Sequence, residues 1–217
     1  MRLIALIPIL FSLVACTNPP PAEESCNFVQ NSFKRRVSWA RTPIKFYADK
    51  TITDEQYKGV LDAMEVWNQE FDRPVFELIG RTGDTKGLPA PRLNAEGRVI
   101  SDGYNGIYRV EKAVFANTSE KDEQARTSIS YRGDFIYEAD ILIDGSEQFY
   151  YQDLATQASD KKIQFKSLLI HELGHVLGLG HVEIAGVESV MYPKLQFGQL
   201  RNELGDIDRD SLACEYQ

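Results

Sequence analysis

The residues in this chain with the clearest capacity for chemistry are its three histidines, which all lie within one eleven-residue segment of the 217 residues. They are His171, His175 and His181, and Glu172 follows the first of them. Neutral imidazole is a preferred ligand of Zn²⁺, and residues four apart on a helix lie on the same face. We therefore predict that His171 and His175 bind one Zn²⁺ from a helix, with the Glu172 carboxylate beside it as a base.

His181 joins the same site only if the helix ends before it. In a continuous helix it would lie about 15 Å along the axis from His171, at a rise of about 1.5 Å per residue. Gly178 stands where the chain must turn back, and glycine tolerates the left-handed conformation that ends many helices. Three imidazoles leave one ligand position open, which is the pattern of a catalytic zinc. Core histidines and a closed structural zinc site are the disfavoured alternatives.

The segment resembles the HExxHxxGxxH zinc motif of the metzincin metalloendopeptidases at every fixed position. Met191 lies ten residues after His181, in a run that resembles the Met-turn of that clan. The resemblance implies that Met191 forms an apolar floor beneath the three ligands, where ordinary core packing is the alternative. The triplet beginning at Met191 is similar to that of the matrixins, so Tyr192 and Pro193 are expected to shape the substrate pocket.

Two features of vertebrate matrixins are missing from the sequence. It has no cysteine-switch propeptide motif, so the sequence does not support latency through a thiolate on the zinc. No further histidines remain for a second, structural zinc, and we expect one catalytic ion. Asp102, Asp134 and Asp144 lie beside glycines and are candidate Ca²⁺ ligands, although solvated turns are the favoured interpretation.

The resemblance covers roughly residues 40–216 and implies an α+β fold. This metzincin-like zinc peptidase domain would have a twisted mixed five-stranded sheet, an active-site helix, the Met-turn and a C-terminal helix. Apolar patterning predicts strands at 44–47, 75–79, 107–110, 127–131 and 139–143, with a hairpin turn at 132–134 and a long loop at 80–104.

Helices are expected in three places. The first starts after a capping arrangement at Thr53. The zinc-binding helix is expected to begin near Ser159 or Asp160 and to run to Gly178. A closing helix is expected at 207–216, with Asp206 as its cap.

The resemblance also implies how a substrate binds. An extended peptide would pair antiparallel with an edge strand of the sheet, so that backbone hydrogen bonds give affinity and side-chain pockets give specificity. The edge strand expected here consists of Arg126, Thr127, Ser128, Ile129, Ser130 and Tyr131.

The first residues are typical of an exported protein. Arg2 and the apolar run 3–14 are too short to span a bilayer, which needs about 20 residues, and are interpreted as a signal peptide over 1–15. The run ends in Leu-Val-Ala-Cys, which resembles the bacterial lipobox and implies lipidation of Cys16; a plain signal peptide is the alternative. Residues 16–32 are interpreted as a Pro-rich tether and 33–217 as the catalytic domain. Thr17 is not the aspartate that marks inner-membrane retention, so the outer membrane is favoured.

Cys26 and Cys214 remain as an even pair at the two ends of the folded part. We predict a disulfide between them, away from the zinc. Two unpaired apolar residues, or Cys26 as a second membrane-side thiol, are the alternatives. The formal net charge of −8 argues against nucleic acid or an anionic lipid surface as a partner. One domain and a monomer are expected.

These features together predict a zinc-dependent endopeptidase that acts on protein or peptide substrates. Glu172 would take a proton from the attacking water and return it to the leaving amine. Two competing functions share the same residues: a zinc amide hydrolase acting on cell-wall peptides, and a non-catalytic binding lipoprotein. The intact Glu172 argues against the second.

Overall fold

The computed structural model describes residues 21–82, 93–95, 99–111, 123–147, 149–151 and 162–216. The predicted signal peptide and Cys16, the predicted site of lipidation, lie outside these residues. So do the expected helix start at Ser159 or Asp160 and parts of the loop predicted at 80–104. Among the described residues, no helix has both the length and the apolar character needed to cross a bilayer.

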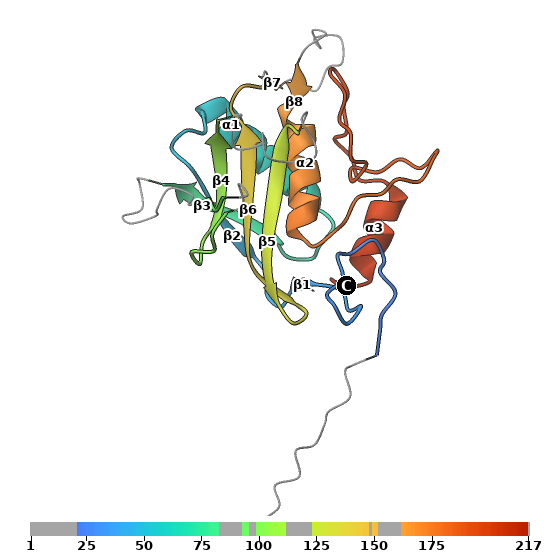
Figure 1. The fold of residues 1–217 in the computed structure, drawn as a ribbon. Coiled ribbons are helices and arrows are strands. Elements are labelled where there is room, and N and C mark those ends of the chain that lie inside the picture. The colour runs from blue at the N-terminus through green and yellow to red at the C-terminus, as the bar shows by residue number, and fades with distance from the viewer. Residues whose placement is uncertain are drawn as a thin grey trace, which may run out of the picture.

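A mixed sheet with the spatial order β3-β2-β4-β6-β5 forms the centre of the fold, as predicted (Figure 1). β2, β3, β4 and β6 run parallel, whereas β5 at the edge runs antiparallel to β6. The strands are β2 (Ile44–Ala48), β3 (Phe76–Arg81), β4 (Asn105–Val110), β5 (Ala125–Arg132) and β6 (Phe135–Asp144).

Three short strands accompany this sheet. The two-residue β1 (Ser38–Trp39) pairs with the start of β6 and adds a sixth strand to the five that were predicted. β7 (Phe149–Tyr150) and β8 (Ile163–Gln164) form a separate two-stranded sheet. The turn between β5 and β6 lies at 133–134, where Gly133 has φ of +63°, so the predicted hairpin is present.

The first helix, α1 (Asp54–Asn68), begins as predicted. The side chain of Thr53 accepts a hydrogen bond from the Gln56 amide, and the Gln56 side chain accepts one from the Thr53 amide. This reciprocal capping satisfies two backbone donors that the first turn leaves without partners. α1 packs against α2 (Phe165–Val176), and the Trp67 indole N–H donates to the carbonyl of Ile170.

The start of α2 was predicted several residues too early. Ile163 and Gln164 belong to β8, and Gln164 then serves as the N-cap by accepting a hydrogen bond from the Ser167 amide at 2.7 Å. Polar residues near 159 resemble a helix start, but strand pairing at 163–164 requires extended backbone. The helix ends as expected, because Gly178 takes a left-handed φ of +100°.

The cap of the last helix was also predicted wrongly. α3 spans Asp206–Ala213, so Asp206 is its first helical residue and Gly205 is its N-cap. Asp208 supplies the carboxylate that accepts the Gly205 amide at 2.8 Å. The helix stops at Ala213, three residues before the predicted end.

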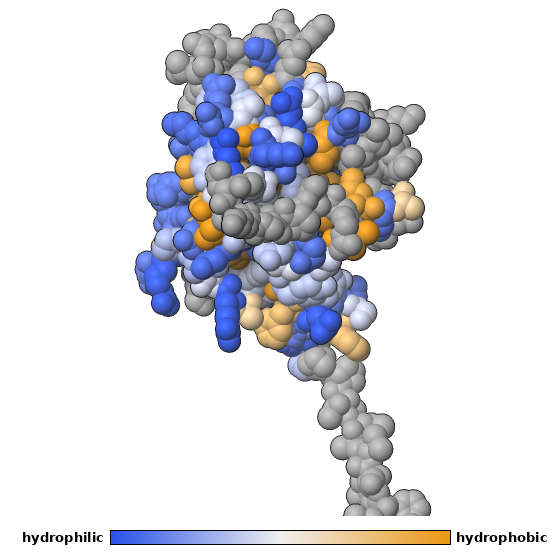
Figure 2. Space-filling model, turned by 90° about the vertical axis from the view of Figure 1, so that its left-hand side faces the viewer, coloured by the Kyte–Doolittle hydropathy of each residue, from blue (hydrophilic) through white to orange (hydrophobic). Residues whose placement is uncertain are grey.

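The core lies between the sheet and helices α1 and α2, with Trp67, Phe46, Phe76 and Phe165 among its largest buried side chains. Figure 2 shows hydrophilic residues in blue over much of one face, with apolar residues in smaller orange groups. Burial of these apolar side chains is the main favourable contribution to folding.

The disulfide predicted between Cys26 and Cys214 is present, with a Cα–Cα distance of 6.5 Å. Residues 26–32, assigned from the sequence to the tether, pack against the domain. Phe28 is only 4% exposed, and it forms an isolated antiparallel bridge with Leu179. The folded part of the chain therefore includes these residues.

Candidate active site

The three histidines converge on one point. The Nε2 atom of His175 lies 3.1 Å from Nε2 of His171 and 3.2 Å from Nε2 of His181. A tetrahedral zinc with Zn–N bonds of ~2.0–2.1 Å requires nitrogen–nitrogen distances of about 3.3 Å. α2 supplies the first two histidines, and the turn at Gly178 brings back the third, so the residues fit a single zinc ion.

Backbone carbonyls orient two of the three imidazoles. Nδ1 of His171 lies 2.8 Å from the carbonyl oxygen of Val190, and Nδ1 of His175 lies 2.8 Å from that of Leu179. A ring that donates from Nδ1 presents its Nε2 lone pair to the metal. Burial lowers the pKa of His175 to about 4 and lowers the pKa of His171 well below its usual range. Both rings are therefore neutral at pH 7, as metal ligands must be.

Glu172 is buried beside these ligands, with 4% of its surface exposed. The hydroxyl of Thr127 on β5 donates to its Oε2 atom at 2.6 Å. Burial raises the pKa of Glu172 to about 7, while the Thr127 hydrogen bond opposes that rise. A carboxyl group with a pKa in this range can both accept and release a proton near neutral pH.

Met191 is buried beneath α2, with 1% of its surface exposed. A Cβ atom added at Gly174 would lie 2.2 Å from the Met191 sulfur, so the helix and the methionine are in direct contact. The predicted apolar floor thus lies under the helix that carries His171 and His175.

The support of this turn was not foreseen from the sequence. Asp208 on α3 accepts hydrogen bonds from the Ser189 hydroxyl at 2.5 Å and from the Val190 amide at 3.0 Å. The Met191 amide in turn donates to the Ser189 hydroxyl. An acidic residue at the third position of a helix was the available signal, but nothing local indicates that it also binds residues 18 and 19 positions earlier.

An open cleft of about 1180 Å³ runs past the histidines and Glu172. Of the predicted edge strand, Arg126, Thr127 and Ile129 line this cleft, whereas Ser128, Ser130 and Tyr131 do not. In the described part of the chain, β5 pairs with β6 alone and is therefore an edge strand. The predicted pocket residues Tyr192 and Pro193 also line the cleft, as do residues 194–197.

The cleft also contains residues that the sequence did not indicate. Val29 of the N-terminal segment lines it, as does Glu123. The Glu123 carboxylate forms an ion pair with the Arg126 guanidinium, with a 2.9 Å bond from Nε to Oε1. Of the candidate Ca²⁺ ligands, Asp134 pairs instead with Arg35, and the histidine cluster is the one metal-binding group found among the described residues.

Residues 111–217 match the family model described as matrixin. The matched stretch contains β5, the histidine cluster, Glu172 and the turn at Met191. The matched region, residues 111–217, is matrixin-like. Every group that converges on the cleft, apart from Val29, falls within the match.

Two curated relatives are similar over short segments. A putative matrix metalloproteinase of Trichoplusia ni ascovirus 2c is 41% identical over 56 residues, which is 25% of this chain and 11% of that protein. Metalloendoproteinase 2-MMP of Arabidopsis thaliana is 35% identical over 54 residues, again 25% of this chain and 14% of that protein. The matched segment thus spans only a small part of either relative.

Among solved structures, high choriolytic enzyme 1, a hatching enzyme zinc-protease from the medaka Oryzias latipes, aligns with 88% of this chain and 95% of its own. The sequence identity is 12% and the TM-score is 0.38.

Proposed function

We propose that this chain is a zinc-dependent endopeptidase that hydrolyses peptide bonds in extended protein or peptide substrates. The observation that carries the proposal is the convergence of three Nε2 atoms beside the buried carboxylate of Glu172, in an open cleft. Three imidazoles and an adjacent carboxyl group are the components of a hydrolytic zinc centre.

The roles of the residues follow from their geometry. When bound, one zinc ion supplies an activated water and a Lewis acid for the substrate carbonyl. His171, His175 and His181 hold the ion. Thr127 binds Oε2 of Glu172, which leaves Oε1 to take a proton from the attacking water and return it to the leaving nitrogen.

The substrate would lie extended along β5. An unpaired strand edge offers alternating backbone donors and acceptors to a peptide, which gives affinity without sequence preference. Side-chain preference would then come from the region lined by Tyr192, Pro193 and residues 194–197.

We further propose that Cys16 is lipidated and anchors the domain to the outer membrane. The support is the lipobox-like sequence that ends at Cys16 and the polar, Pro-rich residues that follow. Pro21, the first described residue, lies five positions after Cys16, so this part of the tether would span at most about 18 Å.

The function is tested with the purified full chain. We expect one zinc per chain and chelator-sensitive cleavage of casein and of a quenched extended peptide. Glu172→Ala should retain zinc and fold but lose about 10²–10⁴-fold in kcat/KM, because the base is removed and the ligands are not. His175→Ala should lose zinc.

Four results would contradict the proposal in different ways. Retention of full zinc by His175→Ala would exclude the metal site, and more than about a tenth of wild-type kcat/KM in Glu172→Ala would exclude the base. Cleavage of cell-wall peptides alone would indicate an amide hydrolase. Zinc binding without any hydrolysis would indicate a binding lipoprotein.

A further inference from the structure

The loop that carries His181 is paired with the N-terminal part of the chain. The Gly180 amide donates to the Asn27 carbonyl at 2.6 Å, and the Val29 amide donates to the Gly178 carbonyl at 2.8 Å. Between these bonds, Phe28 and Leu179 form an antiparallel bridge. We call residues 23–37 the N-terminal strap. Its residues 27–29 therefore form a short ladder with the residues immediately before His181.

The strap and the loop before His181 approach each other so closely that the residue type at position 178 is constrained. A Cβ atom at Gly178 would lie 2.3 Å from the carbonyl oxygen of Val37 and 3.2 Å from the Phe28 ring. Gly178 also has a left-handed φ of +100°, which side chains rarely adopt. Both the turn and its contact with the strap thus require glycine here.

His181 differs from the other two histidines in how it is held. His171 and His175 each have a backbone carbonyl on Nδ1, whereas the structure records no hydrogen bond to Nδ1 of His181 among the described residues. The His181 side chain is also exposed. Such an outer partner usually fixes the orientation of a ligating imidazole. The position of His181 therefore depends on its backbone, and that backbone is paired with the strap.

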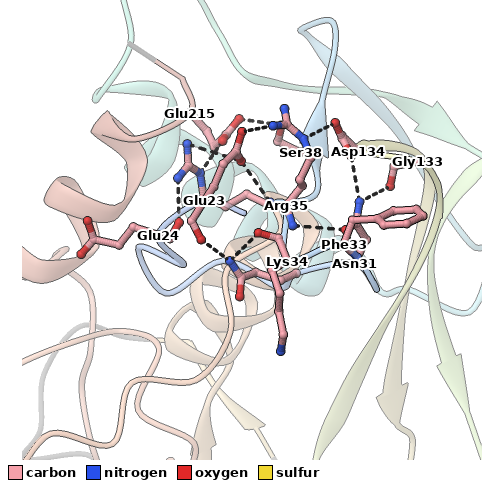
Figure 3. Close-up of polar contacts among 12 residues, drawn as sticks. Glu23, Glu24, Asn31, Phe33, Lys34, Arg35, Ser38, Gly133, Asp134 and Glu215 are labelled. Carbon is pink, nitrogen blue, oxygen red and sulfur yellow. Dashed lines mark hydrogen bonds and ion pairs between the residues drawn. The ribbon is translucent and has the colours of Figure 1, made fainter. Parts of the chain in front are cut away.

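The strap itself is fixed at several points. The Cys26–Cys214 disulfide joins it to the end of α3, and the Asn27 side chain donates to the Ser211 hydroxyl at 2.8 Å. Figure 3 shows Arg35 between the carboxylates of Glu23 and Asp134, with nitrogen–oxygen distances of 2.7 and 2.8 Å. These ion pairs are partly exposed and contribute little individually. The disulfide and the buried Phe28 ring are the stronger restraints.

We propose that the disulfide-fixed strap positions His181 and thereby sets the zinc affinity of the site. This inference rests on the proposed zinc centre. Cys26 precedes Asn27, whose carbonyl binds the Gly180 amide, and His181 follows Gly180. The disulfide thus lies next to the residue that binds the backbone just before His181, whereas its place in the sequence suggested that it lies away from the zinc.

The test replaces both cysteines with serine in the full chain and measures zinc affinity by competition with a chromophoric chelator. Loss of an outer-shell restraint typically costs about 10–100-fold in metal affinity, and we expect at least a tenfold loss for Cys26→Ser/Cys214→Ser. The visible spectrum of the Co²⁺-substituted chain should change as well, because it reports the number of imidazoles on the metal.

A matched control separates positioning from general destabilisation. The Asn68 side chain accepts hydrogen bonds from the amides of Val75 and Phe76 between α1 and β3, and neither bond involves the strap. Asn68→Ala should lower the melting temperature but keep wild-type zinc affinity and the wild-type Co²⁺ spectrum. All measurements are made well below the lowest melting temperature.

A thermodynamic cycle isolates the role of His181. In a His181→Ala background, removal of the disulfide should cost no further zinc affinity, because the ligand that the strap positions is gone. Should the double serine variant not fold, Asn27→Gly is the milder variant: it keeps the left-handed backbone at φ +62° and removes the bond to Ser211, and a few-fold loss is expected.

The outcomes distinguish this inference from the proposed function. A wild-type chain that binds no zinc contradicts the zinc centre itself. If the wild-type chain binds zinc and the folded serine variant has the same zinc affinity and the same Co²⁺ spectrum, only the positioning role of the strap is contradicted. That role is also contradicted if Asn68→Ala loses as much zinc affinity as the serine variant. The same holds if removal of the disulfide in the His181→Ala background costs its full amount of zinc affinity.

Discussion

Thr127 is the side chain that acts most directly on Glu172. Its hydroxyl donates to Oε2 at 2.6 Å, and a hydrogen bond to a carboxylate favours the charged form. Burial acts in the opposite direction and raises the pKa of Glu172 to about 7. In the proposed mechanism the deprotonated form of Glu172 is the base. These two effects would then determine the pH at which activity falls on the acid side of the profile.

We predict that Thr127→Val moves the acid limb of kcat/KM to higher pH by up to about one unit. Valine has nearly the shape of threonine but cannot donate, so the carboxylate loses stabilisation and its pKa rises. Rates should differ most below neutral pH and converge above it. Thr127→Ser, which keeps the hydroxyl, should restore the wild-type profile. An unchanged acid limb in the valine variant would mean that the hydrogen bond has no part in the reaction.

At the scale of elements, the contact between α2 and the Met-turn depends on Gly174. Glycine in a helix costs roughly 1 kcal/mol relative to alanine. At this position a Cβ atom would meet the Met191 sulfur at 2.2 Å and the Trp67 ring at 3.0 Å, and both side chains are buried. Insertion of a methyl group into a packed core costs typically 1–3 kcal/mol. The steric cost therefore outweighs the gain in helix propensity.

Gly174→Ala should lower the free energy of unfolding by up to about 2 kcal/mol, although alanine is the better helix former. Equilibrium urea denaturation measures this change. In a double-mutant cycle with Met191→Ala, the loss of stability caused by Gly174→Ala should largely disappear, because the added alanine methyl group clashes with the Met191 side chain. A stabilised Gly174→Ala variant would show that α2 and the Met-turn are free to move apart.

At the scale of the whole molecule, the Cys26–Cys214 disulfide joins the first described part of the chain to the end of α3. Figure 1 shows the described N-terminal residues beside α3 and at the same end of the molecule as the β5–β6 turn. An anchor at Cys16 would therefore hold the domain by this end. The β7–β8 sheet lies at the opposite end of α2 and would point away from the membrane.

Cys16→Ser should release the protein from the membrane fraction. Each buried CH₂ of an acyl chain contributes ~0.8 kcal/mol, and stable anchoring needs more than one chain, so loss of the modified residue should abolish it. Fractionation of cells followed by a high-salt wash measures the change, with the Glu172→Ala chain as a control that should stay with membranes. A serine variant that still pelleted after the wash would be incompatible with the lipid anchor.

The features of the fold and of the site that could be predicted from the sequence are those that depend on local backbone geometry. The spacing of His171 and His175 places both rings on one helix face, and Gly178 marks the end of that helix, whatever the rest of the chain does. Thr53 and Gln56 cap each other within one turn. With Cys16 assigned to lipid, Cys26 and Cys214 were the remaining pair.

The tertiary structure decided what depends on contacts between distant residues. α2 begins at Phe165 because Gln164 pairs in β8 before it caps the helix. Asp208 holds the Met-turn from another helix, and Thr127 reaches Glu172 across 45 residues. His181 depends on a strap that begins 158 residues earlier, at residue 23. None of these pairings leaves a periodic signal in the sequence, because long-range hydrogen bonds are determined by how the packed elements bring the backbone together.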